Sequence, residues 1–219
     1  MLSIKPIFII ILLFIAHFGF SQLELGLKGG FTKSWPGYGD VELPEGAQTD
    51  VNGYNISIFT GLEISNGFGV NFNPGFTRRG AACFPGWQPQ FNGDSRVFLN
   101  YFDLPVMIFK RVDLKFIEII PSVGYGINIL KSAFLHQDLQ AGEGVIVSVE
   151  ELDVGSSAVN SYNRYDHGFH LNLKIQRNLF KHHFIFIETA YYSGMTDFDQ
   201  LNISKTRNIN VNFGFGYVI

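Results

Sequence analysis

The sequence has few of the residues that mark several common protein classes. Charged residues make up only 16% of its 219 residues, against about 25% in a typical soluble domain. The only cysteine, Cys83, cannot form an internal disulfide. The 16 Lys and Arg residues are balanced by 19 Asp and Glu and form no basic block, so we expect no nucleic-acid partner. Beyond residue 20 no run approaches the roughly 18 apolar residues of a membrane helix, which excludes a helical membrane protein.

Apolar and aromatic residues are abundant instead. The chain is 46% hydrophobic and contains 23 Phe and 24 Gly, and its mean hydropathy is +0.13. This is too apolar for an ordinary cytosolic protein, yet the length fits one domain with a sizeable core.

The N-terminal segment is typical of an export signal. Lys5 supplies a positive charge, the run 7–16 is apolar, and Gly19-Phe20-Ser21 provides small residues for signal peptidase. We therefore predict a signal peptide over 1–21, cleaved before Gln22, and one β-barrel domain over 22–219. No cysteine follows the apolar run, so we expect no lipoprotein anchor.

Apolar residues then alternate with polar or small ones, as in strands with one lipid-facing and one polar face. The last segment is the clearest, with Asn and Gly on its second face. Its apolar face consists of Ile209, Val211, Phe213, Phe215, Tyr217 and Ile219. Similar segments predict eight strands, near 22–32, 53–65, 68–80, 96–110, 115–131, 165–177, 183–195 and 205–219. In the second of them, Phe59 breaks the pattern.

The connections alternate between long and short. Asn66-Gly67 is a tight-hairpin dipeptide, and 111–114 and 178–182 are also short. The connections 33–52, 81–95, 132–164 and 196–204 are longer. Short periplasmic turns and long outer loops are typical of outer-membrane barrels. Since apolar strand faces in lipid require every backbone group to be paired, the sequence predicts an all-β, eight-stranded antiparallel up-and-down transmembrane β-barrel in the outer membrane.

An eight-stranded barrel is just wide enough for its own side chains, so we expect a lumen filled by a salt-bridge plug rather than a solute pore. A proton path or small-ligand site is the alternative. The side chains predicted to face inward are Glu24, Lys28, Glu63, Arg79, Asp103, Glu118, His170, Lys174, Glu188 and Arg207. Aromatic residues near strand ends are predicted to form interfacial girdles, and they are Tyr101, Tyr191, Tyr192 and Tyr217.

The sequence contains few indications of a catalytic site. His167, His170 and Ser161 lie close in sequence and could serve a lipid-modifying enzyme, but no nucleophile motif accompanies them. His182-His183 falls in a predicted turn, no spaced Cys/His cluster indicates zinc, and Gly29-Gly30 lacks a phosphate-binding pattern. We therefore expect no catalytic, cofactor-binding or metal-ligating residues and no cofactor.

The longest predicted loop, 132–164, is long enough to suggest a function. Within it, 145–152 could form a hairpin above the membrane. The loop is either a solvated acidic surface or a contact surface for protein partners or divalent-bridged lipopolysaccharide. Its acidic residues are Asp138, Glu143, Glu150, Glu151 and Asp153, and Trp35, Tyr38 and Trp87 add aromatic surface in other loops.

Four segments of the chain resemble the PorT-like outer-membrane β-barrel proteins of Bacteroidota, and the resemblance covers nearly the whole mature chain. The segments are Gly26-Leu27-Lys28-Gly29-Gly30, Tyr101-Phe102-Asp103-Leu104-Pro105-Val106, Pro121-Ser122-Val123-Gly124-Tyr125-Gly126 and the run 188–196. In that last run, Ala190 stands where the family often carries Arg, which removes an expected lumen partner of Glu188. The resemblance implies a role in the secretion system that exports proteins with a C-terminal sorting domain.

The resulting expectation is a non-enzymatic outer-membrane protein, an accessory or scaffold in envelope assembly or protein secretion. Its expected partners are outer-membrane lipid, lipopolysaccharide and envelope or secretion-complex proteins. The alternatives are a lipid-modifying enzyme of the lipase or acyltransferase type and a small-ligand-binding barrel, including a soluble barrel with its Phe residues turned inward.

Overall fold

The computed structural model describes residues 22–37, 50–83, 93–141, 144–152, 154–155, 162–197 and 205–219. The predicted signal peptide, Tyr38, Trp87 and Ser161 lie outside these ranges. The strands are β1 (Gln22–Gly37), β2 (Val51–Ser65), β3 (Phe68–Phe72), β4 (Gly75–Cys83), β5 (Gly93–Lys110), β6 (Val112–Leu114), β7 (Ile117–Ala141), β8 (Gly144–Leu152), β9 (Tyr165–Asn178), β10 (His183–Asp197) and β11 (Lys205–Val218). Among the described residues, no helix is long and apolar enough to cross a bilayer.

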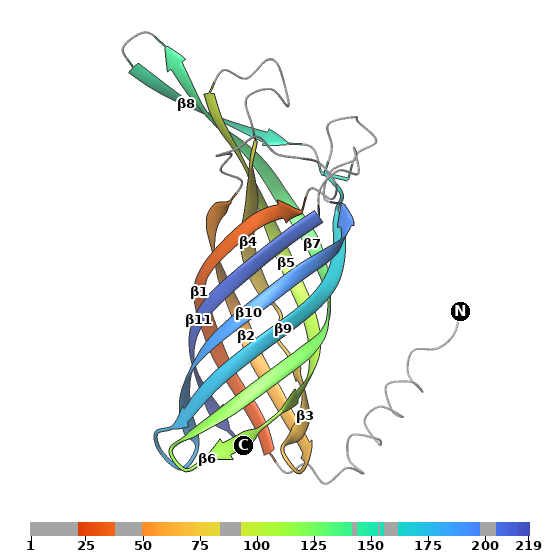
Figure 1. Ribbon diagram of the computed structural model, residues 1–219, viewed down its shortest axis with the longest axis vertical. Coiled ribbons are helices and arrows are strands. Elements are labelled where there is room, and N and C mark those ends of the chain that lie inside the picture. The colour runs from red at the N-terminus through yellow and green to blue at the C-terminus, as the bar shows by residue number, and fades with distance from the viewer. Residues whose placement is uncertain are drawn as a thin grey trace, which may run out of the picture.

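The sheet closes on itself as an antiparallel barrel (Figure 1). β1 pairs with β2 on one side and with β11 on the other. β3 and β4 together occupy one position between β2 and β5, and β5 pairs along its length with β7. β9 and β10 complete the ring between β7 and β11. The predicted eight-stranded up-and-down barrel is confirmed.

Pro74 divides the predicted strand 68–80 into β3 and β4. Proline has no N–H to donate to a ladder, so pairing is interrupted there. The carbonyl of Pro74 still accepts a hydrogen bond from the Ile58 N–H at 3.0 Å, and the Asn73 N–H donates to the Pro105 carbonyl at 3.3 Å. The wall therefore stays continuous across the break.

The two ends of the barrel differ as the connection lengths predict. At the turn end, Asn66 and Gly67 have φ of 51° and 77°, the left-handed pair of a two-residue hairpin. β1 starts and β11 finishes at this end, where the Ile219 N–H donates to the Leu23 carbonyl at 2.8 Å. At the opposite, loop end, β8 and the end of β7 form a hairpin that projects beyond the barrel (Figure 1). This confirms the predicted hairpin within 132–164.

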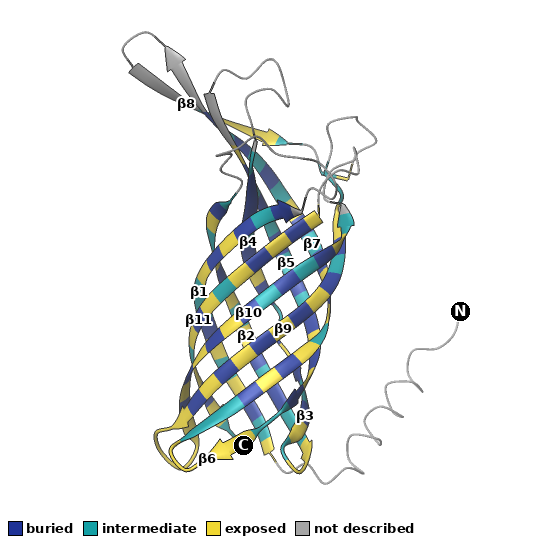
Figure 2. Cartoon of the chain, in the orientation of Figure 1, coloured by how far each residue is buried: buried dark blue, intermediate teal, exposed yellow. Residues whose placement is uncertain are grey.

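Residues along each strand alternate between buried and exposed, which gives the alternating bands in Figure 2, and the two faces differ in polarity. Outward-facing Phe213 and Phe215 are 60% and 62% exposed, and Leu171 is 59% exposed. Inward-facing side chains are buried and mostly polar. The inward-turned soluble barrel is thereby contradicted, because its Phe residues point out of the wall. Phe59, the residue that broke the pattern, is inside and 2% exposed.

Three expectations about side-chain direction are wrong. Tyr101 and Tyr192, predicted for the girdles, are 0% and 1% exposed in the lumen. Arg207, predicted to face inward, is exposed on the outer face. The reason is strand parity: Tyr101 shares a face with Asp103, Tyr192 shares one with Glu188, and Arg207 alternates with the inward-facing Asn208.

Candidate functional site: a lumen sealed in three layers

The turn end of the lumen is closed by one arginine that contacts three carboxylates. Arg111 lies between β5 and β6, and its guanidinium contacts Glu24, lies 2.6 Å from Glu118 and lies 3.0 Å from Glu63. Lys174 on β9 adds a second cation 3.3 Å from Glu24. Burial acts to lower the pKa of Arg111, but the neighbouring carboxylates together outweigh it, so that the pKa is raised above its usual value. We call these five residues the lower cluster.

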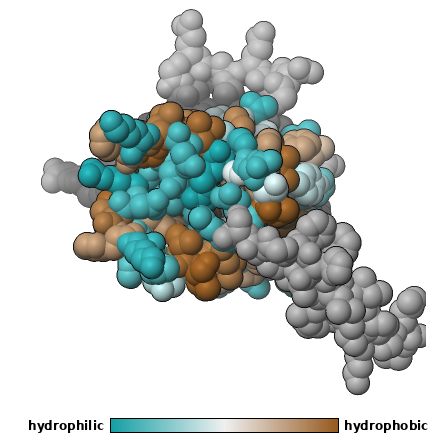
Figure 3. Space-filling model, turned by 90° about the horizontal axis from the view of Figure 1, so that it is seen from below, coloured by the Kyte–Doolittle hydropathy of each residue, from teal (hydrophilic) through white to brown (hydrophobic). Residues whose placement is uncertain are grey.

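An aromatic layer lies against the lower cluster. The ammonium of Lys174 is 3.9 Å from the centre of the Phe59 ring and 5.2 Å from that of Phe186. Phe184 meets Phe59 edge-on, with ring centres 6.3 Å apart. The cation over aromatic faces is an attractive arrangement. Seen from the turn end of the barrel, polar residues occupy the centre of the molecule and apolar residues lie around them (Figure 3).

The loop half of the lumen holds a second arginine, Arg79, whose side chain is 1% exposed. Its Nη2 lies 2.8 Å from Asp103, and its Nη1 lies 4.0 Å from Asp166. The guanidinium also lies over the Tyr101 and Tyr192 rings, at 5.0 and 4.3 Å from their centres. We call these five residues the upper cluster.

Neighbouring hydroxyls complete the upper cluster. Thr77 donates to Asp103 at 2.6 Å, while the Tyr192 and Thr206 hydroxyls donate to Asp166 at 2.7 and 2.8 Å. Such bonds are needed because a buried carboxylate is costly unless it is both paired and hydrogen-bonded.

An apolar cap lies above the upper cluster. It contains Tyr101 and consists otherwise of Ala81, Val97, Leu99, Leu130, Ala133 and Leu135. Leu152 at the end of β8, with Val154 and Tyr162, packs against it. Leu152, Val154 and Tyr162 thus help to close the loop end of the lumen.

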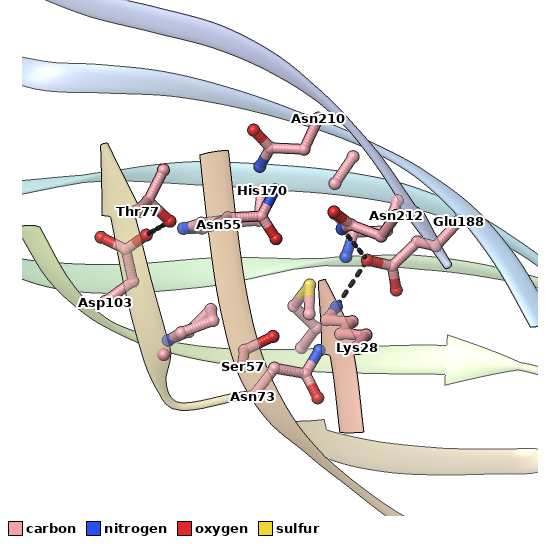
Figure 4. Close-up of a pocket in the computed structure, with 15 residues that line it drawn as sticks. Lys28, Asn55, Ser57, Asn73, Thr77, Asp103, His170, Glu188, Asn210 and Asn212 are labelled. Carbon is pink, nitrogen blue, oxygen red and sulfur yellow. Dashed lines mark hydrogen bonds and ion pairs between the residues drawn. The ribbon is translucent and has the colours of Figure 1, made fainter. Parts of the chain in front are cut away.

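Between the clusters, a cavity of about 40 Å³ lies beside an ion pair (Figure 4). Lys28 and Glu188 are 2.5 Å apart, and Asn212 donates to Glu188 at 3.0 Å. Ala190 lines the cavity. At roughly 10–15 Å³ per water, this volume holds about three or four water molecules and not an organic ligand.

The cavity wall carries polar atoms that have no partner within the described residues. They include both amide atoms of Asn73, the Nε2 of His170 and the Oδ1 of Asn172. Water can satisfy such atoms. The middle layer is therefore a small pocket with polar walls between the two ionic clusters, of a size that water can fill.

The predicted lumen residues other than Arg207 do face inward, and most meet an ion-pair partner. Glu188 has no arginine at position 190 to pair with, but it keeps a cation because Lys28 on β1 supplies one. Asp166 was missed, although it shares the inward parity of His170. Arg111 was missed because it lies in a turn, where no strand periodicity applies.

The two described histidines that were considered for catalysis, His167 and His170, lie on opposite faces of the wall. His170 is buried in the lumen, while His167 lies on the outer face, 2.5 Å from the Tyr125 hydroxyl. At the turn end, the His182 Nδ1 lies 3.1 Å from the Val218 carbonyl, and His183 packs against Tyr217. Within the ranges that the structure describes, no group of three His, Cys, Asp or Glu residues is placed to hold a metal ion.

No family model and no curated protein matches the sequence, so the PorT-like resemblance stays a prediction. Solved structures are similar. Neisserial surface protein A has a TM-score of 0.48 at 12% identity, over 89% of this chain and 96% of that one. OprG of Pseudomonas aeruginosa has a TM-score of 0.48 at 11% identity, over 90% of this chain and 95% of that one. Ail of Yersinia pestis has a TM-score of 0.42 at 14% identity, over 90% of this chain and 99% of that one.

The assignment of this chain to a membrane rests on its own geometry. A closed sheet pairs the backbone of every barrel strand, and the wall is apolar outside and polar inside. An even number of strands, short turns at one end and long connections at the other complete the architecture of an outer-membrane β-barrel. The chain is an integral β-barrel protein of the outer membrane.

Proposed function

We propose that this barrel is a non-enzymatic and non-conducting component of the outer membrane that acts through its loop-end surface. The observation that carries the proposal is the sealed lumen. Two ionic clusters and an apolar cap occupy the path that a solute would take. Because side chains fill the lumen, we infer that the protein acts through its outer surface.

The projecting β7–β8 hairpin is the best candidate for that surface. β8 pairs with β7 and with no other described strand, so its second edge presents free backbone groups. Val149 on β8 is 56% exposed, and Glu150 and Glu151 are exposed beside it. Partner strands commonly add to such edges. An accessory or scaffold role in envelope assembly or protein secretion follows, in line with the PorT-like resemblance.

Shortening the hairpin tests this function. In the variant, residues 136–149 are replaced by Asn-Gly, which keeps the Leu135–Glu150 pairing, and Glu150 and Glu151 are changed to Gln. The tagged protein is extracted gently from outer membranes. We expect the wild type to migrate in a large complex whose other chains mass spectrometry identifies. The variant should migrate alone, while its heat-dependent gel shift shows a folded barrel. A wild type that migrates alone, or a folded variant that keeps the complex, would contradict the scaffold role.

The non-enzymatic assignment has its own test. His170→Ala and His167→Ala are each expected to leave the mass spectrum of lipid A unchanged in cells, because the two imidazoles lie on opposite faces of the wall. A changed spectrum in either variant would favour the lipid-modifying enzyme instead.

A further inference from the structure

The barrel strands separate their charges by face. On the strands that form the closed ring, β1–β5, β7 and β9–β11, every carboxylate whose side chain the structure describes points into the lumen; Asp113 on the short β6 is exposed at the turn end. The inward carboxylates are Glu24, Glu63, Asp103, Glu118, Asp166 and Glu188. The charges on the outer face of the same described residues are all positive. They are Lys33, Arg78, Arg96, Lys110, Lys131, Arg177, Lys205 and Arg207.

Most of the outer-face cations gather at the loop end of the barrel. We call this group the cationic rim, and it consists of Lys33 on β1, Arg78 on β4, Arg96 on β5, Lys131 on β7, and Lys205 and Arg207 on β11. The rim begins where the apolar outer face stops. Lys33 follows Phe31, which is 77% exposed, and Arg207 precedes Ile209, which is 40% exposed. The cations therefore lie at the level where acyl chains give way to headgroups.

Most of the rim is not neutralised by the protein itself. Lys33 is paired with Asp50 at 2.9 Å. The Arg78 guanidinium lies 4.4 Å from the centre of the Phe98 ring, and its Nε has no hydrogen-bond partner in the described part of the chain. Arg96, Lys131 and Arg207 have no ion pair with any described residue. Positive charge thus stays uncompensated at the membrane boundary.

We propose that the cationic rim binds the phosphate groups of anionic lipid in the loop-side leaflet, which in an outer membrane is lipid A. Guanidinium and ammonium groups pair with phosphate through charge-assisted hydrogen bonds. Each Lys or Arg near an anionic membrane surface adds to the electrostatic attraction. The rim cations come from separate strands and face outward, which suits several lipid headgroups around the barrel rather than one dissolved ion.

The test uses the full mature barrel in vesicles of three compositions: phosphatidylcholine alone, with phosphorylated lipid A, and with lipid A whose phosphates have been removed. We expect only phosphorylated lipid A to raise the thermal unfolding midpoint and to remain bound in native mass spectra. In the triple variant Arg96→Gln, Lys131→Gln and Arg207→Gln, binding should weaken about tenfold or more. The gel shift should show the triple variant folded, since these side chains are outside the lumen.

A matched control lies on the same rim. Lys33→Gln removes one positive charge that Asp50 already neutralises, so it should weaken binding less than Lys131→Gln does. The proposal is overturned if the folded triple variant binds phosphorylated lipid A as tightly as the wild type. It is also overturned if the dephosphorylated lipid binds equally well, or if inorganic phosphate raises the midpoint as much as lipid A does.

Discussion

The upper and lower clusters use the same chemistry in different surroundings. Each is one arginine held between carboxylates from distant strands. Arg79 comes from within a strand, and its cluster lies under an apolar cap. Arg111 comes from a turn, and the side chains of Glu63 and Glu118 beside it are each 14% exposed. Burial, and not the number of ion pairs, should therefore decide how strongly the stability of the barrel depends on each arginine.

The largest expected effect is that of Arg79→Met. It leaves Asp103 and Asp166 without their cation in a site that is shielded from bulk solvent, where their side chains are 10% and 2% exposed. Breaking a buried ion pair from one side costs about 3–5 kcal/mol, and the free energy of unfolding should fall by that amount. Urea unfolding in lipid vesicles, followed by the fluorescence of Trp35 and Trp87, measures it.

Adding Asp103→Asn and Asp166→Asn to Arg79→Met should restore part of the loss, because no unpaired charge then remains. An Arg79→Met variant as stable as the wild type would mean that the upper cluster does not stabilise the barrel.

Glu188→Ala is expected to cost nearly as much, about 3 kcal/mol, because it leaves the Lys28 ammonium buried without its carboxylate. The control is the double variant Lys28→Met/Glu188→Ala, which should be more stable than Glu188→Ala alone. Urea midpoints of the single and double variants provide the measurement. Additive losses would show that the two groups do not interact.

Arg111→Met is expected to cost less, about 1–3 kcal/mol. Three carboxylates lose their shared cation, but Glu63 and Glu118 lie close enough to the surface for water and salt to screen their repulsion. Raising the salt concentration should therefore shrink the loss caused by Arg111→Met and leave that of Arg79→Met unchanged. Equal salt dependence for the two variants would remove the distinction between the clusters.

The smallest effect belongs to an ion pair at the rim. The hydrogen bond and charge of Lys33 lower the pKa of Asp50. Stability from this pair is therefore present above the usual carboxyl pKa and lost as the pH falls through the lowered one. Water screens the pair, so the contribution should stay under about 0.5 kcal/mol. Unfolding of Asp50→Asn and the wild type should converge at low pH; a difference that grows on acidification would contradict this.

Much of the lumen was predictable because strand alternation assigns a face to every residue of a regular strand. Lys174, Glu188 and Arg79 were placed inside by parity alone. The same rule, applied consistently, would have placed Tyr101, Tyr192 and Arg207 correctly and would have found Asp166. Arg111 has no such signal: its direction depends on how the β5–β6 turn folds under the barrel mouth.

The partners within the lumen were not predictable from the sequence. Lys28 and Glu188 are 160 positions apart, and Glu24 and Lys174 are 150 apart. Which groups meet depends on barrel closure and on the stagger between strands. Bulges also shift the stagger, as between Asn100 and Tyr101 on β5.

The sequence by itself determined the strands, their faces and the two kinds of connection, because these follow from local periodicity and turn chemistry. The fold was needed to show that β5 meets β7 along its length, that Arg79 and Arg111 each gather carboxylates from different strands, and that most outer-face cations of the ring strands gather at the loop end. The physical reason is that pairing across a closed barrel joins residues with no local relation, and their electrostatics depend on a burial that only closure creates.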